Sequence, residues 1–487
     1  MEETTMTNTN RVELVFIPSP GMGHLVSAVE MAKLLVDRDQ RLSITLLIMK
    51  APFKTKANYS PAQSLSTAAA SRIRFVDLPG DELESDAKFS PHTFLSGFIS
   101  GQKTLVRDAV AQISSSPEAP RLAGFFIDMF CTSMIDVADE FRVPTYVFFT
   151  SGAAFLGLVF HLQTMRDDHN HDVTELKDSD ADLLVPCFVK SVPTKVLPSV
   201  VLDKEGGSEM FHDLVRRIRE TKGILINTFS ELESHAIHSI NTPPVYPVGP
   251  ILNVAGDNDN ESTSAAAILK WLDDQPPSSV VFLCFGSMGC FGVDQVNEIA
   301  HALERSGHRF LWSLRRPPPE GKLEFPGDYT NLEEVLPERF LERTAEIGRV
   351  IGWAPQAAVL AHRAVGGFVS HCGWNSTLES VWYGVPMAAW PQYAEQQLNA
   401  FLMVEELEMA VEIKMDYRNG FYSKSGVALR SEEIEKGIRR LMECGENGMR
   451  KKVEEMREKS RVAVREGGSS YLSIGRLIED VMKIVEQ

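Results

Sequence analysis

The sequence has little of what marks secreted, membrane-spanning or nucleic-acid-binding proteins. Its 487 residues include only six cysteines, none in a CxxC pair, so a reducing compartment is expected rather than a disulfide-stabilised domain. Basic residues are in deficit, with 49 Lys and Arg against 66 Asp and Glu for a net charge of −17. Such a chain repels nucleic acid. An anionic ligand would need a locally positive pocket, built from helix N-termini and histidines.

Long apolar runs are also missing. The nearest approach to a membrane span, TYVFFTSGAAFLGLVF at 145–160, is too short and is interrupted by Thr150, Ser151 and two glycines. It predicts a buried strand followed by a helix. The N-terminal residues show no basic region before an apolar segment, so we expect no signal peptide. We therefore expect a cytoplasmic monomer that forms no stable association with a membrane or with nucleic acid.

Apolar strand-like runs alternate with helical patterns along the chain, which is typical of α/β folds with parallel sheets. A segment rich in Pro, Gly, Asn and Ser at 241–267 interrupts the alternation, which restarts at SVVFLCFGS, 279–287. The length also exceeds what one hydrophobic core supports. The predicted units are a Rossmann-like domain over 1–245, a linker over 246–268, a second Rossmann-like domain over 269–466, and a final helix over 467–487 that packs back on the first domain.

The segment GGFVSHCGWNSTLESVWYG, at 366–384, gathers several polar groups. If it runs from a strand into a helix, free backbone N–H groups and the positive end of the helix dipole face one crevice. His371, Asn375 and Ser376 add side-chain donors, which favours a diphosphate. One turn further on, the Glu379 carboxylate could accept hydrogen bonds from a ribose diol. Each residue alone could be a helix cap, a core histidine or a surface acid, but together they predict a nucleotide site.

A longer stretch around this loop, 353–396, resembles the sugar-nucleotide box of plant family-one, secondary-product UDP-glycosyltransferases over all 44 residues without a gap. NTFSELE at 227–233 and FGS at 285–287 resemble the same family, so the resemblance covers nearly the whole chain. It implies the GT-B fold, in which two tandem doubly wound domains face each other across a cleft. It also implies UDP-glucose as the donor substrate, with no metal ion or other cofactor.

The resemblance assigns roles within the box. The implied donor-binding residues are Trp353 and Ala354 at the uracil, Gln356 and Glu379 at the ribose, His371, Asn375, Ser376 and Ser287 at the diphosphate, and Glu395, Gln396, Trp374 and Thr150 at the sugar. Glu395 stands where many relatives have Asp, which keeps the charge but lengthens the arm. Family members that use glucose mostly have Gln at the position of Gln396, whose carbonyl and amide could both meet sugar hydroxyls, whereas known galactose users have His.

The N-terminal half offers a candidate general base. PSPGMGHL at 18–25 places His24 in a glycine-rich turn that opens a helix. There the dipole disfavours imidazolium, so we expect a neutral ring able to take a proton. A dinucleotide-binding turn is the weaker interpretation, because Val26 stands where GxGxxG needs its last glycine. Asp128 ends the run GFFID and by itself could equally be a helix cap. The resemblance favours a partner that orients the base histidine.

With this base, the resemblance implies an inverting transfer of glucose from UDP-glucose to a hydroxyl of a small lipophilic acceptor, such as a phenol or flavonoid, to give a β-O-glucoside. The residues expected to line the acceptor pocket are Gly21, Phe126, Met129, Phe130 and Phe155. Aromatic residues at such spacings are also typical of a hydrophobic core without a binding role.

Other interpretations fit parts of the same pattern. A UDP-sugar epimerase would need no acceptor pocket, and a catalytically silent nucleotide-sugar sensor could keep every residue named above. DSDAD at 178–182 resembles the metal-binding DxD motif of some glycosyltransferases, but its polar surroundings predict a solvated loop. DNDNES at 257–262 begins like a calcium loop, yet Ser262 and Ile268 replace the required Gly and Glu. Neither segment is predicted to hold a metal ion.

Overall fold

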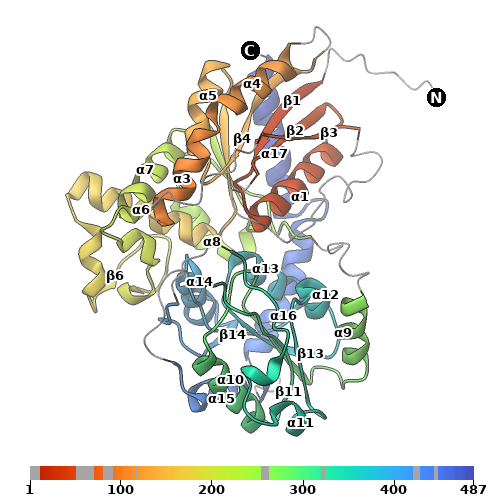
Figure 1. The fold of residues 1–487 in the computed structure, drawn as a ribbon. Helices are drawn as coiled ribbons and strands as arrows, with labels where there is room; N and C mark the ends of the chain where they lie inside the picture. The colour runs from red at the N-terminus through yellow and green to blue at the C-terminus, as the bar shows by residue number, and fades with distance from the viewer. Residues whose placement is uncertain are drawn as a thin grey trace.

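The structure, a computed structural model, places most of the chain in two layered units, one above the other in Figure 1. It describes residues 11–50, 71–79, 91–115, 119–253, 263–319, 324–419, 428–443 and 448–486. The DNDNES segment lies outside the described residues. Among the helices within these ranges, none is long and apolar enough to cross a membrane. The cytoplasmic location stays a prediction.

The N-terminal sheet has seven parallel strands in the order β3-β2-β1-β4-β5-β8-β9. Its strands are β1 Val12–Ile17, β2 Leu42–Ile48, β3 Ile73–Asp77, β4 Arg121–Asp128, β5 Thr145–Phe149, β8 Gly223–Ile226 and β9 Val245–Pro247. The central strands are buried on both faces, as expected of a parallel sheet covered by helices. The strand order reverses between β1 and β4.

The helices of this unit cover both faces of the sheet, and a short antiparallel hairpin lies outside it. They are α1 Met22–Arg38, α3 Pro91–Gly101, α4 Lys103–Ser114, α5 Ile135–Glu140, α6 Ala153–His169, α7 Gly207–Arg219 and α8 Ser230–Ser239. The hairpin strands and short 3₁₀ turns are β6 Asp182–Leu183, β7 Val192–Pro193, η3 Thr132–Met134, η4 Val173–Asp178, η5 Thr194–Val196 and η6 Ser199–Leu202. The DSDAD segment thus runs from the end of η4 to the start of β6.

The C-terminal sheet repeats the plan with six parallel strands in the order β12-β11-β10-β13-β14-β15. Its strands are β10 Val280–Cys284, β11 Arg309–Ser313, β12 Gly348–Ile351, β13 Val365–Ser370, β14 Met387–Ala389 and β15 Ala410–Glu412. Its helices are α9 Thr263–Asp273, α10 Val293–Ser306, α11 Phe340–Arg343, α12 Gln356–Leu360, α13 Trp374–Tyr383, α14 Gln396–Phe401, α15 Ser431–Glu443 and α16 Gly448–Ala463, with 3₁₀ turn η8 Leu332–Glu334 and π-helical turn η9 Leu402–Glu406. The two predicted doubly wound units are confirmed.

The structure shows where the C-terminal unit begins and where the last helix packs. Helix α9 begins at Thr263, inside the segment expected to be linker, because its alanine run is a strong helix former despite the polar residues before it. The last helix, α17 Ser469–Glu486, lies on the N-terminal sheet, where Leu477 and Val481 join the core beneath β1 and β2. Tyr246 Oη of β9 donates to Asp480 Oδ2 at 2.8 Å.

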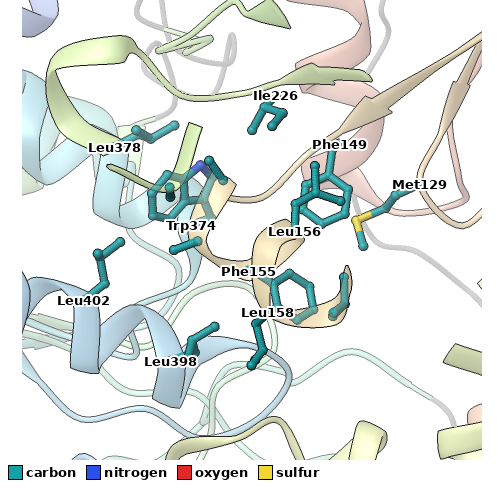
Figure 2. Close-up of a cluster of buried hydrophobic side chains, with 14 of the residues drawn as sticks. Met129, Phe149, Phe155, Leu156, Leu158, Ile226, Trp374, Leu378, Leu398 and Leu402 are labelled. Carbon is teal, nitrogen blue, oxygen red and sulfur yellow. The ribbon is translucent and has the colours of Figure 1, made fainter. Parts of the chain in front are cut away.

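One apolar cluster connects the two sheets. Figure 2 shows Phe149, Phe155 and Leu156 of the N-terminal unit beside Trp374 and Leu378 of α13, and the same cluster continues into α14. Because this core is shared, the carboxyl ends of the two sheets are held close together. Ligands of doubly wound folds bind at these ends, where the strand order reverses.

Candidate active site

His24 and Asp128 meet at the carboxyl edge of the N-terminal sheet. Ile17 of β1 pairs with Ile127 of β4, so the turn after β1 lies beside Asp128. His24 Nδ1 lies 2.7 Å from the buried Asp128 Oδ2. Because a carboxylate only accepts hydrogen bonds, Nδ1 carries the proton. The ring is therefore left with Nε2 as its proton acceptor.

Two neighbours fix this pair. Thr150 Oγ1, just after β5, lies 2.9 Å from His24 Nδ1 and 3.5 Å from Asp128 Oδ2. The Phe130 amide donates to Asp128 Oδ1 at 3.0 Å, and the Phe130 ring meets the imidazole edge-on with 5.5 Å between centroids. The sequence suggested Thr150 only as a sugar contact. Its position also makes it a member of the histidine cluster.

The charge state of His24 differs from the expectation based on the helix dipole. Burial disfavours its charged form, but the carboxylates of Asp128 and Glu395 outweigh that effect and raise the pKa of His24 above its usual value. The dipole argument was wrong in direction because it did not weigh the charge and hydrogen bond of Asp128, to which Glu395 of the other unit adds a smaller effect. With its side chain 28% exposed, His24 is an accessible ring of increased basicity.

His371 follows β13 in the C-terminal sheet and lies between two glycines. A Cβ atom at Gly286 would lie 2.6 Å from His371 Nε2, and one at Gly373 would lie 2.5 Å away. Gly286 also has a φ of +72°, which favours glycine. His371 is only 6% exposed, and burial lowers its pKa to about 4. The ring is therefore a neutral hydrogen-bonding group near pH 7.

Unsatisfied polar atoms mark the space beside this histidine. Within the described residues, His371 Nδ1 and Asn375 Oδ1 are buried without a hydrogen-bond partner. Buried polar atoms in native proteins usually have partners, so such atoms point to a place that a ligand completes. Asn375 Nδ2 lies 3.4 Å from where a Cβ of Gly23 would be. The amide side chain thus faces the turn that carries His24.

The start of α12 lies against the start of α13. Gln356 Nε2 donates to Ser376 Oγ at 2.7 Å and to Glu379 Oε2 at 2.8 Å. These contacts join three of the predicted nucleotide-binding residues into one network. Ser287, exposed on the turn after β10, lies at the same carboxyl edge of the sheet.

Trp353 is 48% exposed, on the loop between β12 and α12, beside the buried Ala354. A large aromatic ring so exposed at a sheet edge suits a stacking platform. The Arg315 guanidinium, after β11, lies 5.1 Å from the centre of this ring. The sequence analysis missed Arg315, although an arginine two residues after the strand-like run FLWS was a usable signal. A cation at this distance stabilises the indole through its π face.

At the sugar end, the structure brings Glu395 to the other unit. Ser151 Oγ donates to Glu395 Oε1 at 3.2 Å, and burial raises the pKa of Glu395. The buried Gln396 side chain uses its carbonyl oxygen to accept from the amides of Gln392 at 2.9 Å and Tyr393 at 3.1 Å. The expectation that both its carbonyl and its amide meet sugar hydroxyls is corrected, because the carbonyl is already occupied.

Several predicted contacts lie in the core instead. The Trp374 indole donates to Asn227 O at 2.7 Å and is buried between the units, so this side chain is not available to a sugar, and only the Trp374 backbone could make the predicted contact (Figure 2). Phe126 stacks between Phe16 and Tyr146, with ring centroids at 4.9 and 5.0 Å. This places Phe126 in the core that contains α1 and α17.

The other residues predicted to line the acceptor pocket fall into two groups, one in the core and one at the histidine cluster. Phe155 packs on Phe149 and Phe211, and Met129 is buried in the same cluster. Two of the five predicted residues lie at the histidine cluster. They are Phe130 and Gly21, the residue that caps α1.

Comparison with known proteins agrees with this arrangement. A family model described as UDP-glucoronosyl and UDP-glucosyl transferase matches residues 243–418. UDP-glycosyltransferase 71E1 of Stevia rebaudiana is 59% identical over 479 residues, which cover 97% of this chain and 99% of that protein. UDP-glucose flavonoid 3-O-glucosyltransferase 6 of Fragaria ananassa is 57% identical, over 96% of this chain and 98% of that protein.

Solved structures give the same result. A transferase from Siraitia grosvenorii in complex with UDP has a TM-score of 0.87 at 51% identity, covering 97% of this chain and 100% of that one. Medicago truncatula UGT71G1 complexed with UDP-glucose has a TM-score of 0.86 at 42% identity, covering 98% and 100%.

The two facing doubly wound units, together with the similarity to these solved structures, define a GT-B glycosyltransferase. The chain belongs to the plant family-one UDP-glycosyltransferases and is an enzyme that uses a UDP-sugar to glycosylate small acceptors. The family predicted from the box at 353–396 is confirmed, and the epimerase and silent-sensor alternatives are set aside.

Proposed function

We propose that this enzyme transfers glucose from UDP-glucose to a hydroxyl of a small lipophilic acceptor, such as a phenol or flavonoid, with inversion to a β-O-glucoside. The observation that carries the proposal is the His24–Asp128 pair, 2.7 Å apart, in the turn that Asn375 of the C-terminal unit faces. The names of the relatives support the donor and the acceptor class, since one is a flavonoid 3-O-glucosyltransferase and another was solved with UDP-glucose.

The His24 cluster suits a single displacement. His24 Nε2 takes the proton of the acceptor hydroxyl while its oxygen forms a bond to the anomeric carbon. The bond from that carbon to the UDP oxygen breaks on the opposite face, so an α-linked donor gives a β product. Asp128 stabilises the imidazolium that forms. A positioned base of this kind contributes roughly a hundred- to ten-thousand-fold in rate.

We assign donor binding to the C-terminal unit. Trp353 stacks on the uracil, and Gln356 with Glu379 contacts the ribose. The diphosphate binds Ser287, His371, Asn375 and Ser376. Because His371 is neutral, stabilisation of the departing UDP comes from hydrogen bonds and the N-terminus of α13. The sugar contacts Glu395 and the amide group of Gln396.

Product analysis tests the proposal. The protein is incubated with UDP-glucose and a panel of flavonoids, simple phenols and terpenoid alcohols, and products are identified by mass and by the NMR coupling of the anomeric proton. A β-glucoside is expected, with unchanged yield after treatment with EDTA. An α-linked product, or the absence of product across the panel despite UDP binding, would contradict it.

A further inference from the structure

The NTFSELE segment, 227–233, connects the two halves of the site, and the reaction proposed above does not use it. It leaves β8 and forms the start of α8. Its Asn227 carbonyl accepts the indole N–H of Trp374, from the other unit, at 2.7 Å. Its last residue, Glu233, interrupts α8 with a φ of −125° and a ψ of 40°. The segment therefore lies directly at the contact between the units.

Glu233 is a buried carboxylate, 3% exposed. Its Oε2 accepts from the Ala153 amide at 2.9 Å and its Oε1 from the Ala154 amide at 2.8 Å. These amides open α6, whose cap residue is Gly152 and has no side chain to satisfy them. Burial raises the pKa of Glu233, and hydrogen bonds from the Thr228 side chain and the two amides counter that effect. The carboxylate thus replaces the missing side-chain cap of α6.

The turn before α6 is packed tightly against this carboxylate. A Cβ atom at Gly152 would lie 2.9 Å from Glu233 Oε1 and 2.9 Å from Cη2 of Trp374. Figure 2 shows Trp374 beside the first turn of α6, which carries Phe155 and Leu156. The turn is therefore held from two sides, by Glu233 of its own unit and by Trp374 of the other.

This turn carries two side chains of the active site. Thr150 Oγ1 lies 2.9 Å from His24 Nδ1, and Ser151 Oγ donates to Glu395 at 3.2 Å. Both precede Gly152 directly in the sequence. A shift of the turn would move both hydroxyls, and a displacement of about 1 Å can cost on the order of a hundredfold in rate.

We propose that Glu233 is a positioning residue, which fixes the 150–154 turn against Trp374 and so holds Thr150 on His24 and Ser151 on Glu395. The inference rests on the proposed function, since the placement of Thr150 affects the rate only if His24 is the base.

Substitution of Glu233 by Gln tests this role. The change replaces one accepting oxygen with an amide donor that faces a backbone N–H. We expect Glu233→Gln to lower kcat roughly ten- to a hundredfold, with an unchanged Kd for UDP, whose proposed site lies on the other unit. The matched control is Glu231→Gln in the same helix. Its carboxylate bonds Ser469 Oγ of α17 at 2.7 Å, away from the turn, and kcat should not change.

A double-mutant cycle separates positioning from general stability. If Glu233 acts through Thr150, Glu233→Gln should cost much less in a Thr150→Val background than in the wild type. Equal fold-losses in both backgrounds would overturn the inference. Should Glu233→Gln fail to fold by circular dichroism, Glu233→Asp, which keeps the charge and shortens the arm, takes its place in the cycle.

His24→Ala is measured in parallel to separate the two proposals. Retained activity of His24→Ala would show that the proposed base is wrong, whatever Glu233 does. An inactive His24→Ala together with a wild-type kcat for Glu233→Gln would leave the base in place and refute only the role of Glu233.

Discussion

Two histidines lie at the carboxyl ends of central strands, one in each unit, and their surroundings shift their pKa values in opposite directions. His24 has a carboxylate at 2.7 Å, and the charges of Asp128 and Glu395 raise its pKa. At His371 burial acts alone and lowers the pKa to about 4. Both lie near a helix N-terminus, so the dipole that they share cannot account for the difference.

The contrast supports the proposal that His24, and not His371, is the base. A carboxylate partner orients the His24 ring and favours its charged form, which is what proton uptake requires. The glycine-lined site of His371 holds the ring without a charge, which suits a hydrogen-bond donor to a ligand that must leave. The partner of each ring, and not its place in the fold, decides its chemistry.

The largest expected effect comes from removing the base. His24→Ala should lower kcat by about a hundred- to ten-thousand-fold while the Kd for UDP stays unchanged. His371→Ala should show the reverse pattern, with a raised donor KM and a smaller loss of kcat. Initial rates with a weakly acidic phenol and calorimetry with UDP measure both. Near-full turnover by His24→Ala would show that His24 does not differ from His371 in acting as the base. Strongly acidic phenols are unsuitable because they ionise without a base.

The next effect concerns the carboxylate that distinguishes the two rings. Asp128→Asn removes a negative charge that raises the pKa of His24, and we expect kcat to fall on the order of a hundredfold. The base must be neutral, so activity rises with pH through the pKa of His24. Loss of the raising charge should therefore move this limb of the kcat/KM profile to lower pH. A limb that stays in place would exclude Asp128 as the cause of the raised pKa.

The fold and the family could be predicted because their signals are local. Strand and helix periodicities, the glycine turns and the contiguous box at 353–396 all lie within short windows of sequence. The features that sequence reasoning missed depend on contacts between distant segments. Glu395 reaches the histidine cluster from the other unit, and the Trp374 indole donates a hydrogen bond to Asn227 across the contact between the units. No local pattern encodes either contact.

The acceptor-pocket predictions show the same limit on a smaller scale. Phe125 and Phe126 are neighbours on β4 and therefore point to opposite faces of the sheet. Periodicity does not say which face looks toward the cleft, and the two residues belong to different cores in the structure. Phe130 lies beyond the strand, where the chain turns toward His24. Residues in such turns are the ones whose role depends on tertiary structure.

A third prediction perturbs the neutral histidine through its glycines. In Gly286→Ala, the added Cβ would lie 2.6 Å from His371 Nε2, on a backbone with a φ of +72°. Strain of about 1–3 kcal/mol at such positions should push the ring away and raise the donor KM roughly tenfold, with little change in the acceptor KM. Gly292→Ala is the control, since a Cβ there would have no atom of the described residues within 4 Å. Equal KM values for UDP-glucose in both variants would contradict the role of Gly286 in placing His371.

The smallest expected effect is on donor choice, which we assign to Gln396. Glucose and galactose differ in the direction of one hydroxyl, so only the placement of polar groups can separate them. The Gln396 carbonyl is held by the amides of Gln392 and Tyr393, and its side chain also hydrogen-bonds the Tyr393 phenol. A side-chain amide has two N–H groups, so we assign the recognition of the sugar hydroxyl to the amide of Gln396. A mismatched buried group costs about 1–3 kcal/mol, so we expect a preference for UDP-glucose over UDP-galactose of at least roughly tenfold in kcat/KM.

Gln396→His should lose most of the glucose activity, because the ring cannot both accept from the two amides and present a donor at the same place. The gain with galactose should be incomplete, since the turn at 392–393 loses its anchor and Glu395 remains set for glucose. Competition between the two donors for one acceptor measures the preference in wild type and variant. If the wild type uses both donors equally, the assignment of donor choice to Gln396 is wrong. Binding of UDP near His371 would then not discriminate between the two sugars.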